Sequence, residues 1–186
     1  MLVWLGSAKP RHRRFLLLDR DGVVNVNRPD YVKSLAEVCF YPEALEALGL
    51  LERNGIGVIL ISNQSGINRG LIAWDDFWEM HEGVLGRVEE SGGAIQAAFY
   101  CPHRPDERCE CRKPAPAMIF ASCRFAGIDP AQTFFAGDSA SDMEAAGNAG
   151  CRGVRILRTQ TDLSMPEAPG YKTLLDAVVS IYGNSF

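Results

Sequence analysis

The chain has 186 residues, of which 47% are hydrophobic and 23% charged, with a formal net charge of −4. This length and composition predict a single domain with a sizeable core and exclude a disordered chain. The acidic balance argues against a nucleic-acid binder, since the basic run at residues 9–14 is short. No apolar run approaches the length of a membrane span, and the first residues lack the form of a secretory signal. We therefore expect a cytoplasmic protein that does not bind a membrane.

The first predicted element is a short buried strand behind an amino-terminal arm. Residues 1–14 show no consistent period, so we expect a loosely attached arm ahead of one domain over residues 15–186. The stretch FLLLDRDG at residues 15–22 then predicts a strand that ends at Asp19 and Asp21. Ligands bind at this end of strands in open α/β sheets, so one carboxylate can act as nucleophile or metal ligand and the other as acid or base. The alternative is a polar turn after a core strand.

Strands and helices alternate through the rest of the chain. Residues 23–40 predict a long polar loop, too irregular for core structure and placed where it can face a substrate. Further strands are expected at residues 58–61, 94–100, 133–136 and 154–157, and helices at residues 42–53, 73–90, 116–126, 141–149 and 171–182. The aromatic residues and His81 of the second helix are interpreted as packing groups. The fold class is α/β: a three-layer Rossmann-like sandwich with a mostly parallel central sheet and no large cap domain.

Polar loops follow four of the predicted strands and would meet at one edge of a parallel sheet. The chemistry-bearing residues in them are Asp19 and Asp21, Ser62 and Asn63, Arg112 and Lys113, and Asp138 and Asp142. Carboxylates surrounded by a hydroxyl, a lysine and an arginine suit a divalent cation with a phosphate above it. Because the candidate ligands are all oxygen atoms, the pattern predicts a hard ion such as Mg²⁺.

A second metal site is predicted by the spacing C-x-H-x5-C-x-C, formed by Cys101, His103, Cys109 and Cys111. Three thiolates and an imidazole fit a closed tetrahedral Zn²⁺ site without an open position for catalysis. This zinc-binding loop is too short to build its own core, so metal would be its main source of order. The alternatives are disulfides or simple buried cysteines, which a chain without an export signal makes less expected.

The motifs resemble, in order and spacing, the four motifs of the haloacid dehalogenase superfamily. They are DRDGV at residues 19–23, ISNQSGINRG at 61–70, CRKP at 111–114 and GDS-x-x-D at 137–142. More narrowly, they resemble the branch that contains D,D-heptose 1,7-bisphosphate 7-phosphatase and histidinol-phosphate phosphatase. The resemblance extends over about residues 15–157.

The resemblance implies a phosphatase that works through a covalent intermediate. Asp19 would attack phosphorus to give an aspartyl-phosphate. Asp21 would protonate the leaving alcohol and then deprotonate the water that cleaves the intermediate. Mg²⁺ would be held by Asp19, by Asp138 and by the backbone carbonyl of Asp21.

The same resemblance implies roles for the remaining polar residues. Ser62 and Lys113 would hold the transferring phosphoryl group, with Asn63 and Arg112 also binding phosphate or substrate. Asp142 would orient metal-bound water or Lys113 from behind the site. Two positions depart from the pattern. Ser62 stands where many members have Thr, which keeps the hydroxyl, and Ser139 stands where some heptose phosphatases have Lys, which removes a cation.

The implied reaction is Mg²⁺-dependent hydrolysis of a small phosphorylated sugar, the 7-phosphate of a heptose 1,7-bisphosphate on the path to lipopolysaccharide heptose. Histidinol phosphate is the nearest alternative substrate. Cations at Arg28, Lys33, Arg104 and Arg108 would suit a second phosphate, which histidinol phosphate lacks. A polynucleotide 3′-phosphatase or a non-catalytic zinc-containing binding module are alternatives of other classes. Without a cap, loops would select the substrate, and we expect a monomer.

Overall fold

The computed structural model describes residues 1–6, 12–158 and 170–183. Its strands are β1 (Leu2–Leu5), β2 (Arg14–Leu18), β3 (Ile56–Asn63), β4 (Ala97–Cys101), β5 (Phe134–Gly137), β6 (Arg152–Ile156) and β7 (Gly170–Tyr171). Its α-helices are α1 (Pro42–Arg53), α2 (Trp74–Glu90), α3 (Ala117–Ala126), α4 (Ala140–Ala149) and α5 (Leu174–Tyr182). Short 3-10 helices occur at η1 (Leu35–Glu37), η2 (Pro105–Glu107) and η3 (Pro130–Gln132).

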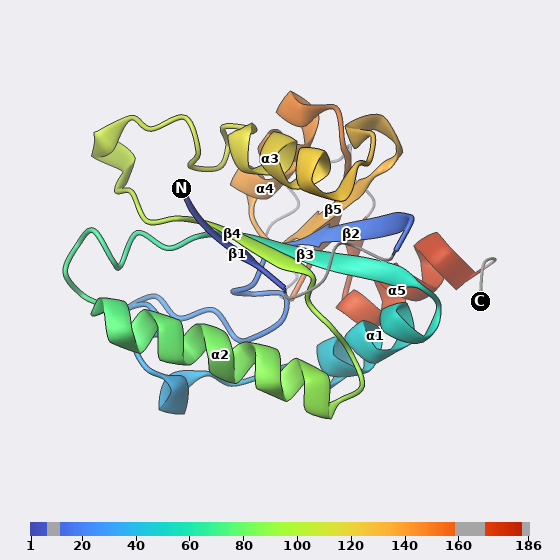
Figure 1. Cartoon of the computed structure of the whole chain (residues 1–186), viewed down its shortest axis with the longest axis horizontal. Helices are drawn as coiled ribbons and strands as arrows, with labels where there is room; N and C mark the ends of the chain where they lie inside the picture. Colours follow the sequence, from blue (N-terminus) through green and yellow to red (C-terminus); the bar gives the residue numbers. More distant parts are fainter. Residues whose placement is uncertain (7–11, 159–169, 184–186) are drawn as a thin grey trace.

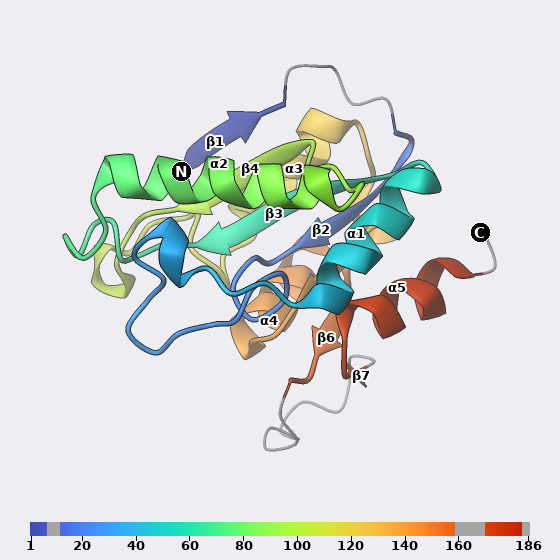
Figure 2. The ribbon, with the colours of Figure 1, turned by 90° about the horizontal axis from the view of Figure 1, so that it is seen from below.

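The strands form one sheet in the order β1-β4-β3-β2-β5-β6-β7. Neighbouring strands are parallel except β1, which pairs antiparallel with β4. Helices α1, α2 and α5 cover one face of the sheet and α3 and α4 cover the other (Figure 1). Seen from below, α2, α1 and α5 lie across the strands in that order (Figure 2). The predicted three-layer, mostly parallel α/β fold is therefore confirmed.

The buried strand β2 divides its side chains between two cores. Leu16 and Leu18 pack with α1, α2 and α5, whereas Phe15 and Leu17 pack with α3 and α4. This alternation follows from the two-residue repeat of a strand, and it explains why the strand is continuously apolar. With both faces covered, polar residues are confined to the two ends of β2, and Asp19 follows directly at its carboxyl end.

The structure differs from the expectation of a loose arm at the start of the chain. Leu2–Leu5 form β1, in which Leu2 is paired with Tyr100 and Leu5 with Ala97 of β4. Trp4 packs edge-on against His81 of α2, with ring centroids 4.9 Å apart. The pairing partner lies about ninety residues further along the chain, so local sequence periodicity did not reveal this strand.

The loop at residues 23–40 also differs from its prediction as a loop outside the core. Val23 and Val24 are fully buried and Val32 nearly so. Backbone bridges from Asn25 to Asp21 and to Phe40 hold the loop against the end of β2. The loop is thus partly core structure. No helix within the described ranges is both long and apolar enough to span a membrane.

Candidate active site

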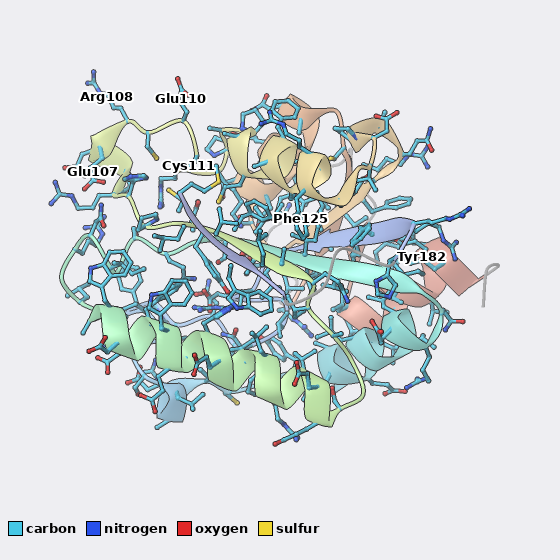
Figure 3. All side chains as sticks on the ribbon, viewed as in Figure 1. Glu107, Arg108, Glu110, Cys111, Phe125 and Tyr182 are labelled. Atoms are coloured by element: carbon cyan, nitrogen blue, oxygen red, sulfur yellow. The ribbon has the colours of Figure 1, made fainter. Side chains whose placement is uncertain are left out.

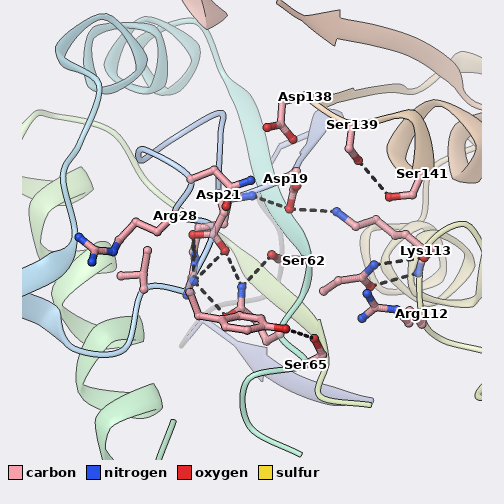
Figure 4. A pocket seen from close by; sticks show the side chains of 16 residues that line it. Asp19, Asp21, Arg28, Ser62, Ser65, Arg112, Lys113, Asp138, Ser139 and Ser141 are labelled. Carbon is pink, nitrogen blue, oxygen red and sulfur yellow. Dashed lines mark hydrogen bonds and ion pairs between the residues drawn. The ribbon is translucent and has the colours of Figure 1, made fainter. Parts of the chain in front are cut away.

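The polar loops predicted to meet at one sheet edge do so around a cavity of about 260 Å³. Figure 4 shows its lining side chains, which come from the ends of β2, β3 and β5, from the loops after β2 and β4, and from the start of α4. Of the predicted site residues, those that line the cavity are Asp19, Asp21, Ser62, Asn63, Arg112, Lys113 and Asp138. Asp142 lies behind it and is fully buried.

Lys113 occupies the centre of a buried charge cluster. Its Nζ atom lies 2.9 Å from Asp19 Oδ1 and 2.6 Å from Asp142 Oδ1, and it donates to the carbonyl oxygen of Ile61 at 2.9 Å. Burial lowers the pKa of Lys113, but the carboxylates of Asp142 and Asp19 outweigh that effect and raise it. The lysine is therefore a fixed positive charge beside Asp19.

The clustered carboxylates of the site repel one another, and further positive charge would stabilise them. Burial raises the pKa of Asp19 to about 7, opposed by Lys113 and reinforced by Asp142 and Asp138. Burial, followed by the charge of Asp142, raises the pKa of Asp138 to about 6. One oxygen from each of Asp19, Asp138 and Asp142 lies within 4.8 Å of the others. A divalent cation at this position would stabilise the ionised forms.

Gly22 allows the turn after β2 to close onto Asp138. Its φ angle is +83°, a left-handed conformation that favours glycine. A Cβ atom there would lie only 1.8 Å from Asp138 Oδ2. The backbone of the turn at Gly22 therefore lies directly against the carboxylate of Asp138.

Asp21 is held by a network of donors that the sequence analysis did not identify. The buried Arg20 contacts both of its carboxylate oxygens, at 3.0 Å and 2.8 Å through Nη2. Asn25 Nδ2 donates to Oδ1 at 2.8 Å, and Gln64 Nε2 donates to Oδ2 at 2.7 Å. Burial by itself raises the pKa of Asp21, but Arg20 and these hydrogen bonds outweigh it and lower the pKa. These contacts therefore stabilise the ionised form of Asp21 relative to the protonated form.

Asn63 contacts the loop that carries Lys113. Its Nδ2 donates to the carbonyl oxygen of Lys113 at 3.1 Å, and its Oδ1 accepts from the backbone N–H of Lys113 at 3.1 Å. Both ends of the amide are therefore used to hold the lysine backbone. Nearby, Ser62 Oγ accepts a hydrogen bond of 3.0 Å from Gln64 Nε2.

Only some of the cations expected for a second phosphate reach the cavity. Arg28 and Arg112 line it, the latter with its Nη1 donating to the carbonyl oxygen of His103 at 3.2 Å. Arg28 is paired with Asp30 at 3.3 Å, as Lys33 is at 2.7 Å, and Arg104 is paired with Asp106 and Glu107 of η2. Lys33, Arg104 and Arg108, which the sequence suggested for a second phosphate, are not among the residues that line the cavity.

The Cys/His loop brings its predicted ligand atoms together. Cys101 Sγ lies 3.5 Å from both His103 Nδ1 and Cys109 Sγ. Cys111 Sγ lies 3.3 Å from His103 Nδ1 and 3.7 Å from Cys109 Sγ. Cys111 lies at the inner end of this loop, while Arg108 and Glu110 point outward (Figure 3). Four ligands around one centre fit the donor set of a structural zinc site.

Arg158, which follows β6, clasps the turn after Asp21. Its Nε donates to the carbonyl oxygen of Gly22 at 3.2 Å and its Nη2 to that of Val23 at 2.8 Å. The guanidinium also pairs with Glu43 and lies over the ring of Tyr41, 3.5 Å from its centroid. The turn that contacts Asp138 is thus fixed from the far end of the chain.

Comparisons with known proteins agree on one family. A family model described as "HAD-hyrolase-like" matches residues 110–178. The D-glycero-beta-D-manno-heptose-1,7-bisphosphate 7-phosphatase of Pseudomonas aeruginosa is 40% identical over 77% of this chain and 81% of its own length. The Pseudomonas putida protein of the same name is 36% identical over 87% of this chain and 93% of its own length.

The fold comparison points the same way. The structure resembles that of D,D-heptose 1,7-bisphosphate phosphatase from B. bronchiseptica complexed with magnesium and phosphate. The TM-score is 0.87 at 33% sequence identity, and the match covers 92% of this chain and 99% of that one.

Proposed function

The chain belongs to the haloacid dehalogenase-like phosphatases, in the heptose 1,7-bisphosphate phosphatase branch, and we propose that it hydrolyses the 7-phosphate of D-glycero-D-manno-heptose 1,7-bisphosphate. One observation carries the proposal. The buried Asp19 at the end of β2 lies beside the fixed charge of Lys113, in a cavity that Arg28 and Arg112 also line. These arginines are suited to the second phosphate of a bisphosphate.

We propose that the reaction takes place in two displacements. An Asp19 carboxylate oxygen attacks phosphorus and the bond from phosphorus to the sugar oxygen breaks. A proton that Asp21 has taken up with the bound substrate passes to that oxygen. Asp21 then removes a proton from water, whose oxygen attacks the aspartyl-phosphate and releases inorganic phosphate and the Asp19 carboxylate. Ser62 donates to the phosphoryl oxygens throughout, and the charge of Lys113 beside Asp19 stabilises the negative charge that develops there.

A divalent cation fits the carboxylate cluster. Asp142 is already paired with Lys113 and Ser139, so its oxygens are engaged. We propose that Asp19, Asp138 and the backbone carbonyl of Asp21 hold Mg²⁺, since hard oxygen donors are what this ion prefers. The ion would neutralise the repulsion between Asp19 and the incoming phosphate. The raised pKa values of Asp19 and Asp138 support this assignment.

Zinc fits the Cys/His cluster for a different reason. We propose that Cys101, His103, Cys109 and Cys111 bind one Zn²⁺ with no position left for substrate. The ion would hold the loop closed, and thereby fix where the following residues Arg112 and Lys113 emerge from it. This proposal gives the second metal a structural role only.

The substrate is tested by phosphate release from a panel. It contains both anomers of heptose 1,7-bisphosphate, histidinol phosphate and a 3′-phosphorylated oligonucleotide. We expect the highest kcat/KM for a heptose bisphosphate. A higher value for histidinol phosphate or the oligonucleotide would overturn the substrate and leave the phosphatase assignment intact.

A matched pair of variants tests the second-phosphate contact. Arg28→Met removes a cation that lines the cavity, whereas Lys33→Met removes a cation of the same loop that does not. We expect KM for the bisphosphate to rise in the first variant and to stay near the parental value in the second.

We also propose that the enzyme works as a cytoplasmic monomer. Light scattering coupled to size-exclusion chromatography tests the oligomeric state.

A further inference from the structure

The side chain of Gln64 connects three groups of the active site. Its Nε2 atom donates to Asp21 Oδ2 at 2.7 Å and to Ser62 Oγ at 3.0 Å. Its Oε1 atom accepts a hydrogen bond of 3.0 Å from Arg20 Nη2. Gln64 is itself buried, with 4% of its surface exposed. The amide is therefore fully engaged inside the protein.

The orientation of the amide follows from its partners. Arg20 carries donors only, so it fixes the oxygen of Gln64 toward itself and the nitrogen toward Asp21 and Ser62. Arg20 also donates to Asp21, at 2.8 Å from Oδ2. A triangle of hydrogen bonds thus joins Arg20, Asp21 and Gln64, and none of the three can turn without breaking at least one of them.

The contact with Ser62 determines what its hydroxyl can do. Because Gln64 Nε2 is a donor, Ser62 Oγ accepts, and its own hydrogen remains available. In the part of the chain that the structure describes, no other hydrogen bond of the Ser62 side chain is present. Ser62 is therefore oriented as a donor into the cavity, where an anionic oxygen can accept.

We propose that Gln64 is a positioning residue that sets the distance and direction between the acid/base carboxylate of Asp21 and the phosphate-binding hydroxyl of Ser62. The inference deepens the proposed function and rests on it, because it needs Asp21 to protonate the leaving alcohol. Asp21 serves the leaving group, and Ser62 serves the phosphoryl group that stays on Asp19. Because Gln64 holds both residues, it sets where the leaving group and the phosphoryl group lie relative to each other.

The test is the dependence of the Gln64→Met effect on the leaving group. Methionine keeps the length and volume of glutamine but has no amide. A sugar phosphate needs a proton from Asp21 to leave, whereas p-nitrophenyl phosphate leaves as a stabilised anion. A misplaced general acid costs about a hundredfold in rate. We therefore expect kcat/KM to fall about a hundredfold with heptose bisphosphate and about tenfold or less with p-nitrophenyl phosphate.

A second readout follows the Ser62 contact. The inhibition constant of inorganic phosphate should rise several-fold in Gln64→Met, because the Ser62 hydroxyl is no longer oriented. When Asp21 is already replaced by Asn, Gln64→Met should lower kcat/KM equally on the two substrates. The effects of substituting two residues that act as a unit are not additive. If Gln64→Met does not fold, Gln64→Asn takes its place, because asparagine shortens the side chain by one methylene group. Its losses of kcat/KM on heptose bisphosphate and on p-nitrophenyl phosphate are then compared in the same way.

The outcomes separate this inference from the proposed function. Equal losses on the two substrates, or parental rates on both, overturn the positioning role of Gln64. Activity of Asp19→Asn on the bisphosphate overturns the proposed function itself, whatever Gln64 does. A loss confined to the sugar phosphate, together with weaker phosphate inhibition, supports the inference.

Discussion

Ser139 and Asp142 cap helix α4 reciprocally. Ser139 Oγ accepts from the backbone N–H of Asp142 at 3.3 Å, and Asp142 Oδ2 accepts from the backbone N–H of Ser139 at 3.0 Å and from its hydroxyl at 2.6 Å. The other carboxylate oxygen of Asp142 lies 2.6 Å from Lys113 Nζ. Asp142, in the first turn of α4, therefore both caps the helix and fixes the lysine of the active site, and Ser139 has a structural role as the N-cap residue.

Asp142→Asn should impair both stability and turnover. The substitution keeps the shape but leaves Lys113 with one carboxylate instead of two, and breaking a buried ion pair costs about 3–5 kcal/mol. We expect a loss of that order in the free energy of unfolding, measured by urea denaturation, and a clear fall in kcat/KM. Asp129→Asn is the matched control, because Asp129 caps η3 from an exposed position. Equal activity in the two variants would contradict the link to Lys113.

Asp19→Asn should lower turnover by several orders of magnitude while the fold persists, because the covalent step needs a carboxylate oxygen of Asp19 as the nucleophile. Phosphate release and circular dichroism check the two halves of this expectation. Asp21→Asn should be similarly inactive yet keep Mg²⁺ affinity better than Asp138→Asn, since only its backbone is proposed to touch the ion. Residual Asp19→Asn activity within about tenfold of the parent would refute the covalent mechanism.

Cys109→Ser should lower kcat/KM strongly although Cys109 does not line the cavity. Loss of zinc would loosen the loop from which Lys113 emerges, and a displacement of about 1 Å can cost a hundredfold in rate. Metal analysis should find about one zinc per chain in the parent and much less in the variant. Cys39→Ser, at an exposed cysteine outside the cluster, should change neither value. A zinc-free parent, or a zinc-free variant with full activity, would separate the loop from catalysis.

His81 should make the fold sensitive to acid. Burial, followed by the charge of Arg20, lowers the pKa of His81 to about 4. The unfolded chain takes up a proton at this residue below about pH 6.5, whereas the folded chain resists it, so the free energy of unfolding falls as pH decreases between these values. About 2 kcal/mol should be lost between pH 6.5 and pH 5.

The measurement compares urea unfolding of the parent and of His81→Phe across this pH range. His81 Nδ1 lies 2.9 Å from the hydroxyl of Tyr100. His81→Phe removes this hydrogen bond, so the variant should be less stable than the parent at neutral pH, where His81 is uncharged in both the folded and the unfolded chain. Toward pH 5 the difference between the two proteins should shrink. A difference that stays constant with pH would show that His81 does not titrate in this window.

Much of the active site at the carboxyl edge of the sheet could be predicted, because it depends on residues that are close together in the sequence. A buried strand must end somewhere, and Asp19 directly follows Leu18 at the end of β2. The C-x-H-x5-C-x-C spacing likewise predicted ligand atoms that do converge. In both cases the informative residues are neighbours in the chain.

The parts that could not be predicted depend on distant partners. Arg20 stands between two carboxylates in the sequence and gives no sign that Gln64 will meet it inside the protein. Lys33 and Arg104 looked available for a ligand, but acids three residues away or fewer already pair with them. Whether a charged side chain is free is decided by its neighbours in space, which spacing alone does not specify.

The clasp of Arg158 on Gly22 has a consequence for the order of folding during synthesis. The two residues are 136 positions apart, so the hydrogen bonds from Arg158 to the turn cannot form until residue 158 has left the ribosome. Domains generally fold as units during synthesis, and contacts this distant in sequence form late. A nascent chain that already has β2 and β3 would hold both aspartates in a turn that is not yet fixed. Phosphatase activity should therefore appear only once Arg158 has emerged, which makes it a marker of completed folding.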